Sequence, residues 1–160
     1  MTLHSSVNWQ QVIKDYNSGA VEYGDPMPPP ATDCELETLR REASGRHLFV
    51  EHEYLEFLRF VNGFWNDGIS FAGAAISADD SFGRNDFVHL NEELQWVEDV
   101  DAIYGSMDGD YFVHSLDGKF RVISGGSGDE FRVYNSFLDM MVGALRMRLP
   151  QPTSRRGTIP

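Results

Sequence analysis

The stretch DYFVHSLDGKFRVISGGSGDEFRVY, residues 110–134, decides the fold class of this chain. It holds three short runs rich in β-branched and aromatic residues, DYFVHSL, KFRVIS and EFRVY, which is typical of β-strands. Asp117-Gly118 separates the first two runs and is a strong hairpin signal, because both residues tolerate the backbone of a tight turn. The glycine-rich segment 125–128 joins the next pair as a turn, since no Lys-Ser/Thr and no helix follow it to hold a phosphate. We therefore expect an antiparallel meander here.

Helical patterns precede the strands. Residues 7–16 place Trp, Val, Ile and Tyr on one helical face, and the segment GDPMPPPAT after them predicts an extended linker. Thr32 and Glu35 have the spacing of a capping box, which predicts a helix from residue 33 to about residue 43. Gly45 is expected to stop this helix in the left-handed conformation.

Two further helices are expected on either side of the sheet sequence. Residues 51–61 carry a broad apolar face, and Asn62-Gly63 is expected to end that helix. ISFAGAAI, residues 69–76, predicts a buried strand, and a last helix is expected from Ser136 to about residue 148. This order predicts an α+β fold, an antiparallel twisted sheet of about four to six strands with helices packed on one face of a single domain.

Charge is the most informative bulk property of the sequence. The chain has 160 residues, with 13 basic against 25 acidic side chains and a formal net charge of -12. Residues 79–110 alone hold ten carboxylates against Arg84, so this run carries -9 of the -12. Nucleic acid and anionic membranes are therefore not expected as partners. The run is either a solvated face that keeps the protein soluble or a surface that attracts a basic partner.

The sequence offers no catalytic set and no cofactor or metal site. Of the five histidines only His47 and His52 are near one another, and their spacing does not place two ligands on one helical face. His114, within a strand pattern, is expected to be a hydrogen-bonded structural residue. Cys34 has no second thiol to pair with and is expected to be a small buried residue. We expect a protein that is not an enzyme, and, without a signal peptide or a long apolar segment, a cytoplasmic one.

Three stretches resemble the SUKH superfamily, the SMI-type domains of bacterial immunity proteins and fungal cell-wall regulators. The first is ATDCELETLRREASGRHLFVEHEYLEFLRFVNGF, residues 31–64, in which Tyr54, Phe57, Leu58 and the Asn-Gly pair match the family pattern. The others are IYGSMDGDYFVHSLDGKFRVI, similar to the central hairpin, and FRVYNSFLDMMVGAL, similar to the last strand and helix. The chain departs from the pattern at Val50-Glu51, where the family often has Leu-Pro. The resemblance implies a SUKH-like domain over residues 31–149, with residues 1–30 as an N-terminal helix and linker and residues 150–160 as a flexible tail.

The resemblance also implies a function, that of an immunity protein. Such a protein binds and neutralises a cognate bacterial polymorphic toxin, and many of these toxins are nucleases with basic clefts that an acidic protein could occlude. The partner-binding residues are then expected within the acidic run: Asp79, Asp80, Asp86, Glu92, Glu93, Trp96, Glu98, Asp99, Asp101, Tyr104, Asp108 and Asp110. Trp96 or Tyr104 is the expected aromatic anchor among these carboxylates.

Three alternatives remain open from the sequence. The chain could be a non-catalytic regulatory scaffold with several weak partners, as the fungal relatives suggest, or a small enzyme that uses paired carboxylates. Phe64 and Trp65 follow the Asn-Gly pair where a loop would ordinarily be polar. We expect both rings to pack into the core, and the alternative is an exposed anchor beside the acidic face.

Overall fold

A computed structural model describes residues 8–21, 27–66, 68–74, 86–93 and 99–148 of the chain. Its helices are α1 (Trp9–Val21), α2 (Asp33–Gly45), α3 (His52–Phe60), α4 (Phe87–Glu93) and α5 (Phe137–Arg148). Its strands are β1 (Phe64–Asn66), β2 (Ile69–Phe71), β3 (Val100–Met107), β4 (Asp110–Ser115), β5 (Phe120–Ile123) and β6 (Glu130–Tyr134). The predicted α+β class is confirmed.

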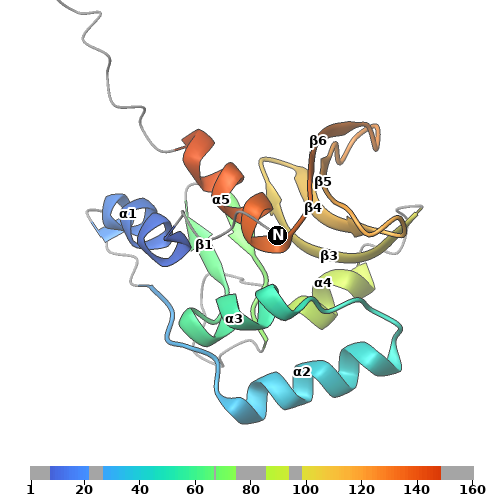
Figure 1. Cartoon of the computed structure of the whole chain (residues 1–160), viewed down its shortest axis with the longest axis horizontal. Helices are drawn as coiled ribbons and strands as arrows, with labels where there is room; N and C mark the ends of the chain where they lie inside the picture. The colour runs from blue at the N-terminus through green and yellow to red at the C-terminus, as the bar shows by residue number, and fades with distance from the viewer. Residues whose placement is uncertain (1–7, 22–26, 67, 75–85, 94–98, 149–160) are drawn as a thin grey trace, which may run out of the picture.

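The strands form one antiparallel meander in the order β1-β2-β3-β4-β5-β6. The Asp117-Gly118 hairpin joins β4 to β5, and the turn at residues 125–128 joins β5 to β6, both as predicted. Gly118 has a φ of 86°, which explains why a glycine is needed there. The sequence did not predict β1, β3 or α4. Figure 1 shows the strongly curled sheet with α3, α4 and α5 against it.

The core lies between one face of the sheet and the helices. Phe137, the first residue of α5, is at its centre, with ring centroids 5.1 Å from Tyr54 of α3 and 5.4 Å from Tyr104 of β3. Phe120 of β5 packs on the same rings, 5.6 Å from Tyr104. Edge-on and tilted contacts at these separations are favourable beyond the burial of area. The aromatic cluster thus fixes which sheet face the helices cover.

Two glutamates tie α3 to the start of α5. A backbone N–H at the start of a helix has no partner within the helix. Phe137 donates its N–H to Oε2 of Glu51 at 2.9 Å, and Leu138 donates to Oε1 of Glu53 at 3.2 Å. The negative charges also suit the positive end of the helix dipole.

Asn62 and Gly63 connect α2, α3 and the strand that follows. The Asn62 side chain accepts the N–H of Ala74 at 2.7 Å and donates to Oε2 of Glu35 at 3.1 Å. Gly63 has a φ of 84°, and a Cβ there would lie 2.9 Å from the backbone N of Gly73. The pair therefore has a structural role. Asn62 links the capping box of α2 to Ala74, and Gly63 lets the backbone pass close to Gly73.

Two details of the sequence interpretation are corrected. Gly45 is the last residue of α2, and the left-handed residue is His47, with a φ of 57°. Arg46 is the C-cap, and it donates its N–H to the Ala43 and Ser44 carbonyls at the end of the helix. Residues 9–21 form a longer helix than predicted, and the buried Ile13 joins the common core. The capping box at Thr32 and Glu35 is present as predicted. None of the helices in the described segments is both long and apolar enough to cross a membrane.

Candidate partner-binding site

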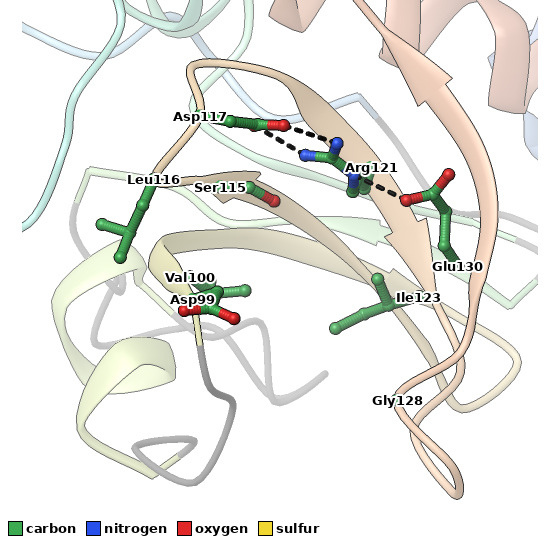
Figure 2. A pocket seen from close by; sticks show the side chains of 9 residues that line it. All are labelled: Asp99, Val100, Ser115, Leu116, Asp117, Arg121, Ile123, Gly128 and Glu130. Atoms are coloured by element: carbon green, nitrogen blue, oxygen red, sulfur yellow. Dashed lines mark hydrogen bonds and ion pairs between the residues drawn. The ribbon is translucent and has the colours of Figure 1, made fainter.

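A groove of about 530 Å³ lies on the sheet face opposite the helices. Strands alternate their side chains between two faces, and the core takes Phe112, Phe120 and Val122, so the residues between them face the other way. Strands β3 to β6 and the segments at their ends supply the lining: Asp99, Val100, Ser115, Leu116, Asp117, Arg121, Ile123, Gly128 and Glu130. Figure 2 shows these side chains in the concave part of the curled sheet. We call this site the groove.

An ion cluster centred on Arg121 occupies one side of the groove (Figure 2). Its guanidinium donates from Nη1 and Nη2 to both oxygens of Asp117, at 2.7 and 2.6 Å, and from Nε to Oε2 of Glu130 at 2.8 Å. The hydrogen bonds from Arg121, followed by the N–H of Lys119, hold the pKa of the Asp117 carboxyl well below its usual range. The hydrogen bonds to Asp117 and Glu130 raise the pKa of Arg121, so the Asp117–Arg121 ion pair stays charged in neutral solution.

The groove carries an excess of negative charge. Asp99, Asp117 and Glu130 contribute three carboxylates against the single guanidinium of Arg121, which leaves a net charge of -2. Asp117 and Glu130 keep about half of their side-chain surface exposed despite their ion pairs. Asp99 is also exposed, and its carbonyl oxygen accepts the N–H of Leu116 at 3.0 Å. Val100, Leu116 and Ile123 add apolar surface between these charges, so the groove suits a ligand with both basic and apolar groups.

The predicted acidic residues do not form one surface in the described part of the chain. Asp86 is mostly buried at the start of α4, where it accepts the N–H of His89 at 2.8 Å. Glu92 is exposed and pairs with Arg46 at the end of α2, at 3.1 Å. The backbone of Glu93 belongs to α4, and its side chain is not described. The predicted residues Asp79, Asp80, Trp96 and Glu98 lie outside the described residues.

The remaining carboxylates of the run lie at both ends of β3. Asp99 and Asp101 are at its start, and Asp108 and Asp110 flank the turn after its end. A strand of eight residues spans about 25 Å, so the two pairs are far apart. Asp101 contacts Nδ1 of the buried His114 at 2.5 Å, which confirms His114 as a hydrogen-bonded structural histidine. Of the predicted site residues whose side chains the structure describes, only Asp99 lines the groove.

The prediction that Tyr104 is an aromatic anchor is wrong. Its side chain is fully buried in the core. Its hydroxyl donates to the carbonyl of Phe49 at 2.6 Å and accepts the N–H of Glu51 at 3.2 Å. Burial raises the pKa of the Tyr104 phenol well above its usual value. The β-strand that contains Tyr104 was not predicted, and its alternation turns this ring inward.

Two other expectations about exposure are only partly met. Phe64 is buried, as predicted, whereas Trp65 is 41% exposed, because neighbouring residues of β1 point to opposite faces. Cys34 is exposed in the first turn of α2 and is not the small buried residue that was expected. No group of three metal-ligating side chains occurs among the described residues.

Asp117, Arg121 and Glu130 were missed as site residues. Asp117 was recognised only as a turn residue, yet its four-residue spacing from Arg121 spans the hairpin and brings the two side chains together. Glu130 reaches Arg121 from the next strand, which no local pattern could indicate. The contact between Glu130 and Arg121 could be predicted only if the pairing of β5 with β6 were already known.

Comparison with known proteins adds no assignment. The chain matches none of the protein-family models, and the curated proteins give no match either. The SUKH resemblance therefore stays a prediction from the order of motifs.

Proposed function

We propose that this chain is an immunity-type binding protein that holds a basic surface of one cognate bacterial toxin and thereby blocks it. The proposal assigns no catalytic residue and no cofactor. The observation that carries it is the groove, in which Asp117 and Glu130 hold the Arg121 guanidinium, Asp99 adds a third carboxylate, and Val100, Leu116 and Ile123 add apolar surface. The overall charge of -12 supports it, because long-range attraction speeds the approach of a basic partner.

The arrangement of Asp117, Arg121 and Glu130 suits recognition of a cation. Arg121 already holds the two carboxylates in position, so an incoming Lys or Arg side chain meets groups that need little reordering. Preorganised charges lose less side-chain entropy on binding than free surface carboxylates do. Toxin nucleases that bind phosphate present such basic side chains, and covering them would block the substrate cleft.

Co-purification from the native host tests the proposal. The bait is the full chain, and the test variant combines Asp99→Asn, Asp117→Asn and Glu130→Gln, which removes three charges while keeping side-chain shape. We expect the native chain to retain one stoichiometric basic protein and the variant to lose it. The native chain should also relieve the toxicity of that protein in cells, and the variant should not.

A matched control separates the groove from bulk charge. Glu37→Gln, Glu42→Gln and Glu56→Gln remove the same number of charges from exposed positions on α2 and α3. This control should retain the partner. Equal loss in both triple variants would mean that only total charge matters, and many weak partners would favour the regulatory scaffold.

A further inference from the structure

Among the described residues, the outer side of β6 is an open edge of the sheet. Strand order places β1 at one end and β6 at the other. At the β1 end, Tyr16 of α1 packs its ring on Phe64 at 5.6 Å and exchanges hydrogen bonds with Asn66 at 3.4 and 3.5 Å. Within the described segments, no strand pairs with the outer side of β6. An edge strand of this kind presents backbone N–H and C=O groups to a partner chain.

The side chains of β6 are unusually exposed for an edge strand. Phe131 is 58% and Val133 is 45% exposed, and Glu130 and Arg132 are exposed as well. Sheet edges are ordinarily protected by proline, by charged side chains, by a bulge, by a short strand or by covering segments. β6 has five residues and no proline; it carries the charged Glu130 and Arg132, and its register against β5 shifts once, between Val122 and Ile123. In the described part of the chain, the edge therefore combines a strand side that no other strand pairs with and two exposed apolar side chains that a bound strand would cover.

This edge is continuous with the groove. Glu130 lines the groove, and Val133 pairs with Arg121 across the two strands and so shares its face. Directly opposite residues of neighbouring strands have Cβ atoms about 5 Å apart. The register of β5 against β6 shifts between Val122 and Ile123, and this brings Glu130 and Val133 to the same face although they are three residues apart. A strand added to β6 would thus place the side chains of one of its faces beside Glu130 and Val133. The -2 charge of the groove favours basic side chains at those positions.

We propose that an extended segment of the partner, with basic side chains alternating with apolar ones, pairs with β6 and extends the sheet. Backbone hydrogen bonds to β6 hold the segment, and its basic side chains lie over the groove beside Glu130. This proposal rests on the proposed function and specifies the part of the toxin that is recognised. Strand addition of this type derives affinity from the main chain and specificity from alternate side chains.

A synthetic peptide tests strand addition without the toxin. The probe is a capped peptide of alternating Lys and Val, as long as β6, titrated into isotope-labelled full-length protein. We expect amide chemical-shift changes centred on residues 130–134 and the facing residues of β5. Changes centred on the turn at residues 108–110 or on α4 would overturn the proposal.

N-methylated peptides separate backbone pairing from attraction between charges. One version carries N-methyl groups on the Lys residues and the other on the Val residues, so each keeps its charge and loses the N–H groups of one edge. We expect one version to bind about tenfold more weakly, since each lost hydrogen bond weakens binding severalfold, and the other to bind as the parent does. Equal affinity of all three peptides would refute strand pairing and leave attraction by charge alone.

The remaining outcomes also distinguish the two proposals. Concentration-dependent dimerisation through β6, with no peptide binding, would show that this edge pairs with a second copy of the chain. It would refute the proposal that a basic segment of the toxin pairs with β6. A host partner retained by the native chain but insensitive to the peptide as competitor would leave the proposed function intact and refute strand addition. Peptide binding at β6 without any host partner would support strand addition at this edge and refute the proposed function.

Discussion

Removing the hydroxyl of Tyr104 should destabilise the protein and leave partner binding unchanged. Tyr104→Phe keeps the ring in the core and deletes a single oxygen. That oxygen accepts the N–H of Glu51 and donates to the carbonyl of Phe49, so the change leaves two backbone groups without their partner. The two groups belong to the segment that leads into α3.

The size of the effect follows from those two hydrogen bonds. A polar group left unsatisfied by the loss of its partner costs about 1–3 kcal/mol when it is buried. The Glu51 site is partly buried, and Phe49 is 38% exposed, so water relieves part of the cost. We expect the free energy of unfolding to fall by about 1–3 kcal/mol in total, a drop in Tm of about 2–10 °C for a domain of this size.

Tyr134→Phe is a matched control for this substitution. The Tyr134 hydroxyl is also buried, against Gly143 of α5, but it has no hydrogen-bond partner among the described residues. Deleting it removes a desolvated group that gains nothing in return. We expect the unfolding free energy of this variant to stay within about 0.5 kcal/mol of the native value or to rise.

Urea denaturation of the two variants tests whether the hydrogen bonds of the Tyr104 hydroxyl stabilise the fold. The midpoint should fall for Tyr104→Phe and hold or rise for Tyr134→Phe, with an unchanged slope in both. Equal losses, or a neutral Tyr104→Phe, would refute the hydrogen-bond argument. Weakened binding of the co-purified partner at native stability would restore Tyr104 as an interface anchor.

Three further results are expected. Gly105→Ala should prevent folding or cause severe loss of stability in a thermal melt, because a Cβ there would collide with a backbone carbonyl of β2. Phe64→Ala should lower the free energy of unfolding by about 3–5 kcal/mol and Trp65→Ala by clearly less, since only the Phe64 ring is buried. Equal losses for the two variants in urea denaturation would contradict the exposed position of Trp65. The Asp86 carboxylate raises the pKa of His89, mainly through its side-chain hydrogen bond. This contact therefore stabilises the folded protein fully at a pH below the ordinary histidine pKa, and the stabilisation is lost as the pH rises through the raised pKa of His89. Asp86→Asn should lower the His89 pKa in an NMR titration, and an unchanged value would rule out the contact.

The parts of the fold that sequence could predict are those set by local chemistry. The capping box at Thr32, the turn at Gly118 and the apolar face of α3 each follow from residues close together in the chain. β4, β5 and β6 were predictable for the same reason, because alternating side chains and turn residues are local signals.

Other parts depended on tertiary contacts. β3 lies in a sequence that is acidic and contains Gly105, which weakens a strand pattern, and it is recognisable only from its pairing with β2 and β4. The start of α5 is capped by Glu51 and Glu53 from 86 and 85 residues away in the chain. No periodicity in a window of sequence contains that information.

The candidate site was predicted in character but not in position. An acidic surface was expected, and the run of residues 79–110 was chosen because its charges are adjacent in sequence. Folding separates Asp99 from Asp108 along β3 and buries most of Asp86, while the hairpin and β6 bring Asp117 and Glu130 to Arg121. Charge density along the chain therefore differs from charge density on the surface.

The association rate of the purified partner, measured at several salt concentrations, tests the groove most directly. We predict fast association that slows as salt is added, and a triple variant (Asp99→Asn, Asp117→Asn, Glu130→Gln) that associates at least about tenfold more slowly and with a weaker salt dependence. The control triple on α2 and α3 should keep most of the native rate. An association rate and a salt dependence that are the same in all three proteins would contradict recognition through the groove.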